Sequence, residues 1–195
     1  MMRISLSLVV AVAVAALMSC ATPKADFYTL SQEVQGASGQ PATPIAVLVG
    51  PGSVPELVDR PQIVVRAGVN HVTFDEFARW AEPLKSQIPR VFVADLSQLL
   101  NSPRVSTLPI GGDAAAAWRV RIDVQRFDAL LGDAVTVDVL WSVLPPGKAP
   151  PIIGRTIASE RCAGPGYDAA VAAWSRALAT VSRAIAAGIM PAPPP

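Results

Sequence analysis

The stretch Trp118-Arg119-Val120-Arg121-Ile122-Asp123-Val124-Gln125 decides the fold, because apolar and polar side chains alternate along all of it. Alternation with a period of two gives a β-strand one apolar face and one polar face. The pattern returns between Val135 and Val143, and the pair Gly132-Asp133 between the two runs suits a hairpin turn. The sequence therefore predicts a β-hairpin with one buried face.

A third strand extends this hairpin. Phe127 breaks the alternation of the first run, which predicts a β-bulge near Gln125–Arg126. After Pro145-Pro146-Gly147, a further strand is expected from about Ile152 to Cys162. The C-terminal half thus predicts an antiparallel meander with one face against the core.

A long amphipathic helix is expected after Gly164-Pro165-Gly166, with Asp168 in its first turn. Its apolar residues recur at spacings of three and four. They are Val171, Trp174, Leu178, Val181 and Ile185. Such a helix either binds a partner or a membrane surface, or packs on the sheet. The second interpretation is preferred, because the sheet needs a cover and the opposite face of the helix is not rich in lysine.

The N-terminal half predicts shorter elements. Ile45 to Val49 is a continuous apolar run, typical of a buried strand. Gln62–Arg66 and Gly68–Phe74 are expected to pair as a hairpin. Residues 77–80 then read as a short turn capped by Asp75.

A second helix is expected to begin near Glu82, with Pro83 in its first turn. Pro89 lies inside the helical pattern and lacks a backbone donor, so we expect a kink there or a helix that restarts after it. Together these elements predict an α/β (α+β) sandwich, in which two main helices cover an antiparallel-rich mixed sheet. Residues 45–190 are expected to form one domain, followed by a disordered tail at 191–195.

The N-terminus has the pattern of an export signal. Residues 1–19 carry one charged side chain, Arg3, followed by an apolar stretch too short to span a bilayer comfortably. The tetrad Leu17-Met18-Ser19-Cys20 resembles the bacterial lipobox, which predicts cleavage before Cys20 and lipidation of its thiol. An ordinary signal peptide ending near a cysteine is the alternative. Residues 20–44 are then a lipid-anchored tether with a short strand at Phe27–Leu30.

Composition narrows the classes of function. The 195-residue chain has a formal net charge of +1, and loss of Arg3 with the signal leaves equal numbers of basic and acidic side chains. This balance gives no electrostatic reason to expect nucleic acid as a partner. Of the two cysteines, Cys162 has no disulfide partner if Cys20 is acylated.

Catalytic and metal-binding patterns are missing from the sequence. A hydrolase needs a nucleophile with a base, and the single histidine, His71, lies on an expected strand. Phosphate-binding loops and clusters of metal ligands are also absent. We therefore expect a protein that is not an enzyme and that has no cofactor.

Several short segments together resemble the ABC-type transport auxiliary lipoproteins, the PqiC/YmbA-like family. The two specific segments are Asp59-Arg60-Pro61-Gln62-Ile63-Val64 and Arg79-Trp80-Ala81-Glu82-Pro83-Leu84, with Phe27–Leu30 and Asn70 in the expected order around them. The resemblance implies a lipoprotein of the outer membrane, since Ala21 is not the aspartate of an inner-membrane retention signal. It also implies a system built from an ABC ATPase, a permease and a periplasmic MCE-domain protein, which moves lipids or other hydrophobic molecules. A homo-oligomer is plausible by analogy with the ring formed by MCE partners.

Six residues of these segments are candidate site residues. They are Asp59, Arg60, Gln62, Asn70, Arg79 and Trp80. One account makes them a partner-contact surface, because Arg and Trp are frequent interface anchors. The other, which we favour, makes them lock the loop before the helix, with Arg79 paired to Asp59 or Glu82. A stand-alone lipid or ligand carrier is the alternative function, and it would need an apolar cavity of about 300 Å³ or more.

Overall fold

The computed structural model describes residues 24–36, 42–109 and 116–190 as two sheets and two long helices. The strands in chain order are β1 (Asp26–Tyr28), β2 (Val47–Val49), β3 (Gln62–Arg66), β4 (Val72–Trp80), β5 (Val105–Ser106), β6 (Trp118–Leu130), β7 (Ala134–Leu144) and β8 (Ile152–Arg161). The helices are α2 (Leu84–Leu99), between β4 and β5, and α3 (Tyr167–Ile189) after β8. The α+β fold class is confirmed, with the strands divided between two sheets.

The larger sheet contains the predicted meander. Its strand order is β5-β2-β6-β7-β8, with β6, β7 and β8 antiparallel and β2 parallel to both of its neighbours. The register of β6 against β7 shifts between Val124 and Arg126, which confirms the predicted bulge. Gly132 has a positive φ of 76° in the turn between these strands, a conformation that glycine adopts without strain.

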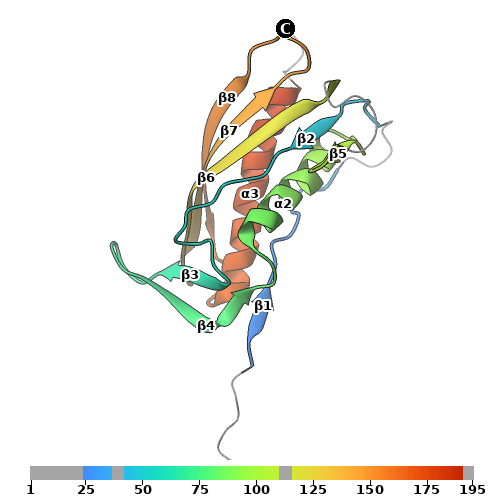
Figure 1. Cartoon of the computed structure of the whole chain (residues 1–195). Helices are drawn as coiled ribbons and strands as arrows, with labels where there is room; N and C mark the ends of the chain where they lie inside the picture. Colours follow the sequence, from blue (N-terminus) through green and yellow to red (C-terminus); the bar gives the residue numbers. More distant parts are fainter. Residues whose placement is uncertain (1–23, 37–41, 110–115, 191–195) are drawn as a thin grey trace, which may run out of the picture.

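One face of this sheet is covered by the helices. In Figure 1, α3 runs along the sheet and α2 lies beside α3. All five residues of the predicted apolar stripe on α3 are buried, and the helix packs on β7 and β8. The preferred interpretation of the last helix, as a cover for the sheet, is therefore confirmed.

Helix α2 differs from its prediction. It begins at Leu84, and Pro83 is the N-cap residue rather than part of the first turn. It continues through Pro89 to Leu99, so of the two expected alternatives, a kink at Pro89 or a restart after it, the restart is excluded. The proline removes one intrahelical hydrogen bond, but Ile88 and Phe92 on either side of it are almost completely buried. Apolar burial of this size offsets the loss of one bond.

The smaller sheet has the order β1-β4-β3. The hairpin of β3 and β4 is confirmed, but the predicted turn at residues 77–80 is wrong, because β4 continues to Trp80. Two contacts keep this segment extended. Strand β1 pairs in parallel with residues 78–80, and the Trp80 N–H donates to the Pro61 carbonyl at 2.7 Å. Both partners are distant in sequence, which is why local patterns missed them.

Several expectations fall on other parts of the chain. The export signal at 1–19, the lipidation site Cys20, the start of the tether and the tail at 191–195 lie outside the described residues. Among the helices of the described part, neither is long and apolar enough to cross a membrane.

Candidate functional site

The two specific segments of the sequence meet in space. Residues 59–61, just before β3, and residues 80–83, at the end of β4 and just after it, line a pocket of about 350 Å³. Five of the six candidate residues belong to this region, and we call them the motif cluster: Asp59, Arg60, Gln62, Arg79 and Trp80. Asn70 lies apart, at the tip of the β3–β4 hairpin, where it is exposed.

A polar chain runs across the β3–β4 hairpin. The Arg60 guanidinium lies 3.9 Å from the centre of the Phe74 ring, an arrangement worth about 0.5–1 kcal/mol at an exposed site. Arg60 Nε also donates to Gln62 Oε1 at 3.2 Å. The Gln62 amide in turn donates to Glu76 Oε2 at 2.8 Å. The chain fixes the direction in which the loop before β3 enters the hairpin.

The charged residues of the motif cluster form ion pairs, but not the expected ones. Arg79 Nη1 lies 3.8 Å from a carboxylate oxygen of Glu76 on its own strand, rather than beside Asp59 or Glu82. The expected pairing is wrong because residues 77–80 were predicted as a turn. Arg79 instead belongs to the extended strand β4, where its side chain lies beside Glu76.

The acidic residues of the loops pair with α2 instead. Asp59 pairs with Lys85 at 2.5 Å, and Glu82 pairs with Arg90. These two pairs tie the loops around the pocket to the first turns of α2. Both pairs are exposed enough for water to screen them, so the pocket rim is polar and close to neutral.

Trp80 is the buried member of the motif cluster. Its side chain belongs to an aromatic group with Phe127 of β6 and Trp174 of α3, at centroid distances of 6.3 and 5.6 Å. Phe127 and Trp174 stack on each other at 4.7 Å. Trp80 is only 5% exposed and joins the small sheet to the main core. This geometry favours a stabilising role for Trp80.

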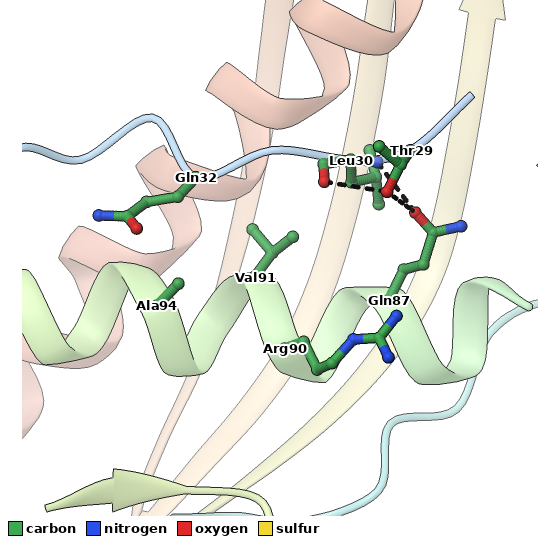
Figure 2. Close-up of a pocket in the computed structure, with 7 residues that line it drawn as sticks. All are labelled: Thr29, Leu30, Gln32, Gln87, Arg90, Val91 and Ala94. Atoms are coloured by element: carbon green, nitrogen blue, oxygen red, sulfur yellow. Dashed lines mark hydrogen bonds between the residues drawn. The ribbon is translucent and has the colours of Figure 1, made fainter. Parts of the chain in front are cut away.

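A second polar region lies between the helices. Residues 29–36, which we call the strap, follow β1 and are hydrogen-bonded to both α2 and α3. Gln87 of α2 accepts hydrogen bonds through Oε1 from the Leu30 N–H at 2.9 Å and from the Thr29 hydroxyl at 3.1 Å. Figure 2 shows these bonds at one end of a small pocket between the strap and α2, about 160 Å³ in volume.

Asp95 holds the strap further along. Its carboxylate is fully buried, and it accepts from the Val34 N–H at 3.4 Å and from the Ser182 hydroxyl at 2.8 Å. Burial raises the pKa of Asp95, and the hydrogen bonds from Ser182 and the strap backbone partly oppose that rise. On α3, Ser175 accepts from the Ser31 N–H at 3.1 Å. Side chains thus replace the strand pairing that would otherwise satisfy the strap backbone.

Sequence reasoning assigned the first two residues of the strap to a short strand and the rest to a loop, and it did not select these side chains. A usable signal was present, because Asp95 follows the apolar residues of α2 and the two serines of α3 lie beside Trp174 and Val181. A polar residue within an apolar stripe needs a buried partner, and the strap supplies it.

Comparisons with known proteins agree with this architecture. The sequence matches the family described as "ABC-type transport auxiliary lipoprotein component" over residues 28–186. A crystal structure of an uncharacterized protein superposes with a TM-score of 0.71 at 21% identity, over 86% of this chain and 99% of the other. A Xanthomonas campestris protein of the DUF330 family gives 0.64 at 19% identity, over 85% and 95%. No protein with curated annotation matches.

The match extends over most of the chain and includes both specific segments and the strap. The protein therefore belongs to the ABC-type transport auxiliary lipoprotein family. The class is that of a membrane-associated lipoprotein that accompanies an ABC transport system. The solved structures show the same fold.

Proposed function

We propose that this protein is a non-enzymatic lipoprotein subunit of an ABC/MCE-type envelope transport system. Anchored by Cys20 at the periplasmic face of the outer membrane, it docks the periplasmic MCE component for transport of lipids or other hydrophobic molecules. The observation that carries the proposal is the family match over residues 28–186, together with the lipobox-like tetrad that precedes it. In this proposal the ABC ATPase of the system hydrolyses ATP, and the permease provides the path for the transported molecule.

The chemistry of the site supports an adaptor. The pocket of the motif cluster is lined by two ion-paired acids, a stacked arginine, prolines and a buried indole. No nucleophile with an adjacent base lines it. Within the described residues, no three His, Cys, Asp or Glu side chains lie close enough together to hold a metal ion. In this proposal the motif cluster fixes the hairpin of β3 and β4 against α2.

The test is recovery of the partner from membranes. The full-length lipidated chain, affinity-tagged at its C-terminus and extracted in mild detergent, should recover an MCE-domain protein. Recovery of none would contradict the docking role. Cys20→Ser should lose acyl labelling and membrane attachment, whereas Cys162→Ser, the matched control, should keep both.

A stand-alone lipid carrier has one observation in its favour. A groove of about 730 Å³ lies over β6, β7 and β8, lined by Leu140, Trp141 and Ile153 among others. A carrier site normally encloses most of its ligand, and this groove is open to solvent. Native mass spectrometry of the membrane-extracted protein decides between the two functions. A stoichiometric lipid that is lost in Ile153→Asp would favour the carrier.

A further inference from the structure

The outer face of the small sheet carries two exposed aromatic rings. On β4, Ala78 and Trp80 point into the core, so alternation points Phe77 and Arg79 the opposite way. On β1, Phe27 pairs with Arg79 and therefore shares that outer face. Phe27 is 65% exposed and Phe77 41% exposed. Among the other aromatic side chains of the described residues, Phe74 is as exposed as Phe77, but the Arg60 guanidinium covers its ring. Phe27 and Phe77 therefore remain as two uncovered aromatic rings on one solvent face.

This face lies close to the predicted anchor. Strand β1 begins at Asp26, six residues after Cys20. A chain of that length spans at most about 22 Å when fully extended. The start of β1 therefore lies within this distance of a bilayer that holds the acylated Cys20.

The remainder of the domain extends away from this end. Tyr28 of β1 contacts Tyr167, the first residue of α3, at a centroid distance of 6.0 Å. Helix α3 has 23 residues and so reaches about 34 Å further, to the opposite end of the molecule (Figure 1). Ile152, at the start of β8, lies close to Gly188 at that far end. Ile153 beside it is 75% exposed, an apolar side chain far from the anchor.

We propose that the outer face of β1 and β4 rests on the surface of the bilayer that holds Cys20, with Phe27 and Phe77 in the interfacial region. The proposal rests on the lipid anchor of the proposed function. Aromatic side chains favour the membrane–water interface. Burial of their apolar surface there adds to the membrane affinity that the acyl chains provide. The contact would set the orientation of the domain, with the C-terminal end of α3 directed away from the membrane.

Charge selects the kind of bilayer. Asp26, Asp75 and Asp168 lie near Tyr28, whose pKa is raised by burial and then by these three carboxylates. The Asp75 carboxylate also accepts from the Phe77 N–H at 2.8 Å, which holds it at this face. Arg79 lies on the same face, but it pairs with Glu76, so Asp26 and Asp75 leave the surround acidic. Anionic headgroups repel such a surround, and a zwitterionic surface fits this face better.

The experiment measures depth at single sites in the full lipidated chain. In a Cys162→Ala background, an environment-sensitive fluorophore is attached at Phe27→Cys, Phe77→Cys, Ile153→Cys or Met190→Cys. Each protein is reconstituted in phosphatidylcholine vesicles that contain brominated acyl chains. We expect quenching at 27 and 77 to exceed quenching at 153 and 190 several-fold. Ile153 is the matched control, because it is apolar and more exposed than either phenylalanine.

A second variant tests the rings themselves. With the fluorophore at Arg79→Cys, on the same face of β4 as Phe77 and opposite Phe27, the double change Phe27→Ser and Phe77→Ser should abolish the quenching. Both rings are exposed, so the domain should keep its circular dichroism and its thermal midpoint.

The outcomes separate the two proposals. A chain that does not float with vesicles overturns the anchor and this orientation together. A chain that floats but is quenched equally at all four sites, or more at 153, overturns the orientation alone. Stronger quenching at 27 on vesicles containing phosphatidylglycerol would overturn the choice of a zwitterionic surface.

Discussion

The motif cluster and the strap contacts differ in how visible they are in the sequence and in how deeply they lie in the fold. Four of the five residues of the motif cluster are charged or polar side chains at the surface, and their partners are mostly exposed too. The side chains that hold the strap are isolated polar residues on apolar helix faces. Gln87, Asp95, Ser175 and Ser182 are each at most 2% exposed.

This difference has an energetic consequence. Exposed ion pairs contribute a median of about 0–1 kcal/mol, because water screens them and both side chains lose entropy. A buried donor or acceptor that loses its partner costs about 1–3 kcal/mol. The residues that identify the family by eye are therefore, apart from Trp80, not the ones on which stability depends most.

The largest effect is expected at the buried member of the motif cluster. Trp80→Ala should lower the free energy of unfolding by about 3–5 kcal/mol, because it opens a cavity beside Phe127 and Trp174. Urea unfolding followed by circular dichroism measures the change. Phe77→Ala, on the outer face of the same strand, is the control and should change stability by less than about 0.5 kcal/mol. A loss of under 1 kcal/mol for Trp80→Ala would mean that the aromatic group does not join the small sheet to the core.

A smaller but localised effect is expected in the strap. Asp95→Ala leaves the Val34 N–H without its acceptor in a buried position, at a cost of about 1–3 kcal/mol. Hydrogen exchange should accelerate at the amides of residues 31–34 before it does so in the meander. Glu33→Ala, an exposed change within the strap itself, should leave both measurements as they are. Uniform acceleration over the whole domain would show that the strap is not a separate unit.

The sequence predicted the elements whose burial is local and periodic. The meander, its bulge and the stripe on α3 follow from side-chain alternation at periods of two and about 3.6, and each is present. The approach of residues 59–61 to residues 80–83 was anticipated only through resemblance. No short-range pattern brings them together, because they are joined by the hairpin and by one backbone hydrogen bond at Trp80.

The missed features depend on contacts between distant segments. The end of β4 is a strand because β1, about fifty residues earlier, pairs with it. The strap appears polar and turn-like in sequence because its backbone is satisfied by side chains of α2 and α3 rather than by a sheet. The loop-like composition of the strap indicates that it does not pair in a sheet. It gives no information on which helices will bind the strap.

The pH dependence of stability should distinguish Asp95 from the surface acids. Burial raises its pKa in the folded state, so the folded protein binds more protons than the unfolded chain just above the usual carboxyl range. The contribution of Asp95 is therefore greatest at acid pH and is lost as the pH rises through the folded-state pKa. As the pH rises through the folded-state pKa, the free energy of unfolding of Asp95→Asn should increase relative to that of the wild type. At higher pH the difference between the two proteins should stay constant.

Asp138 also contributes to the pH dependence of the wild-type free energy of unfolding. The difference between the profiles of the wild type and Asp95→Asn removes this contribution. A hydrogen bond from Arg155 lowers the pKa of Asp138, so its contribution is present above the usual carboxyl range and is lost as the pH falls. Because both proteins retain Asp138, subtracting one urea-midpoint profile from the other isolates Asp95. A flat difference curve between pH 3 and pH 8 (about the range over which carboxyl groups titrate) would show that the strap is open to water.

The smallest effect on stability is expected for the ion pairs of the motif cluster, and it gives the sharpest test of what the cluster is for. Glu82→Gln and Lys85→Gln each break one exposed pair and should change the free energy of unfolding by about 0–1 kcal/mol. If the cluster only fixes the hairpin on α2, capture of the MCE-domain partner should be unchanged in both variants. Loss of capture with stability retained would instead make the pocket rim the docking surface. Glu160→Gln, which breaks the partly exposed pair with Arg176 of α3, is the matched control, and it should leave capture intact under either outcome.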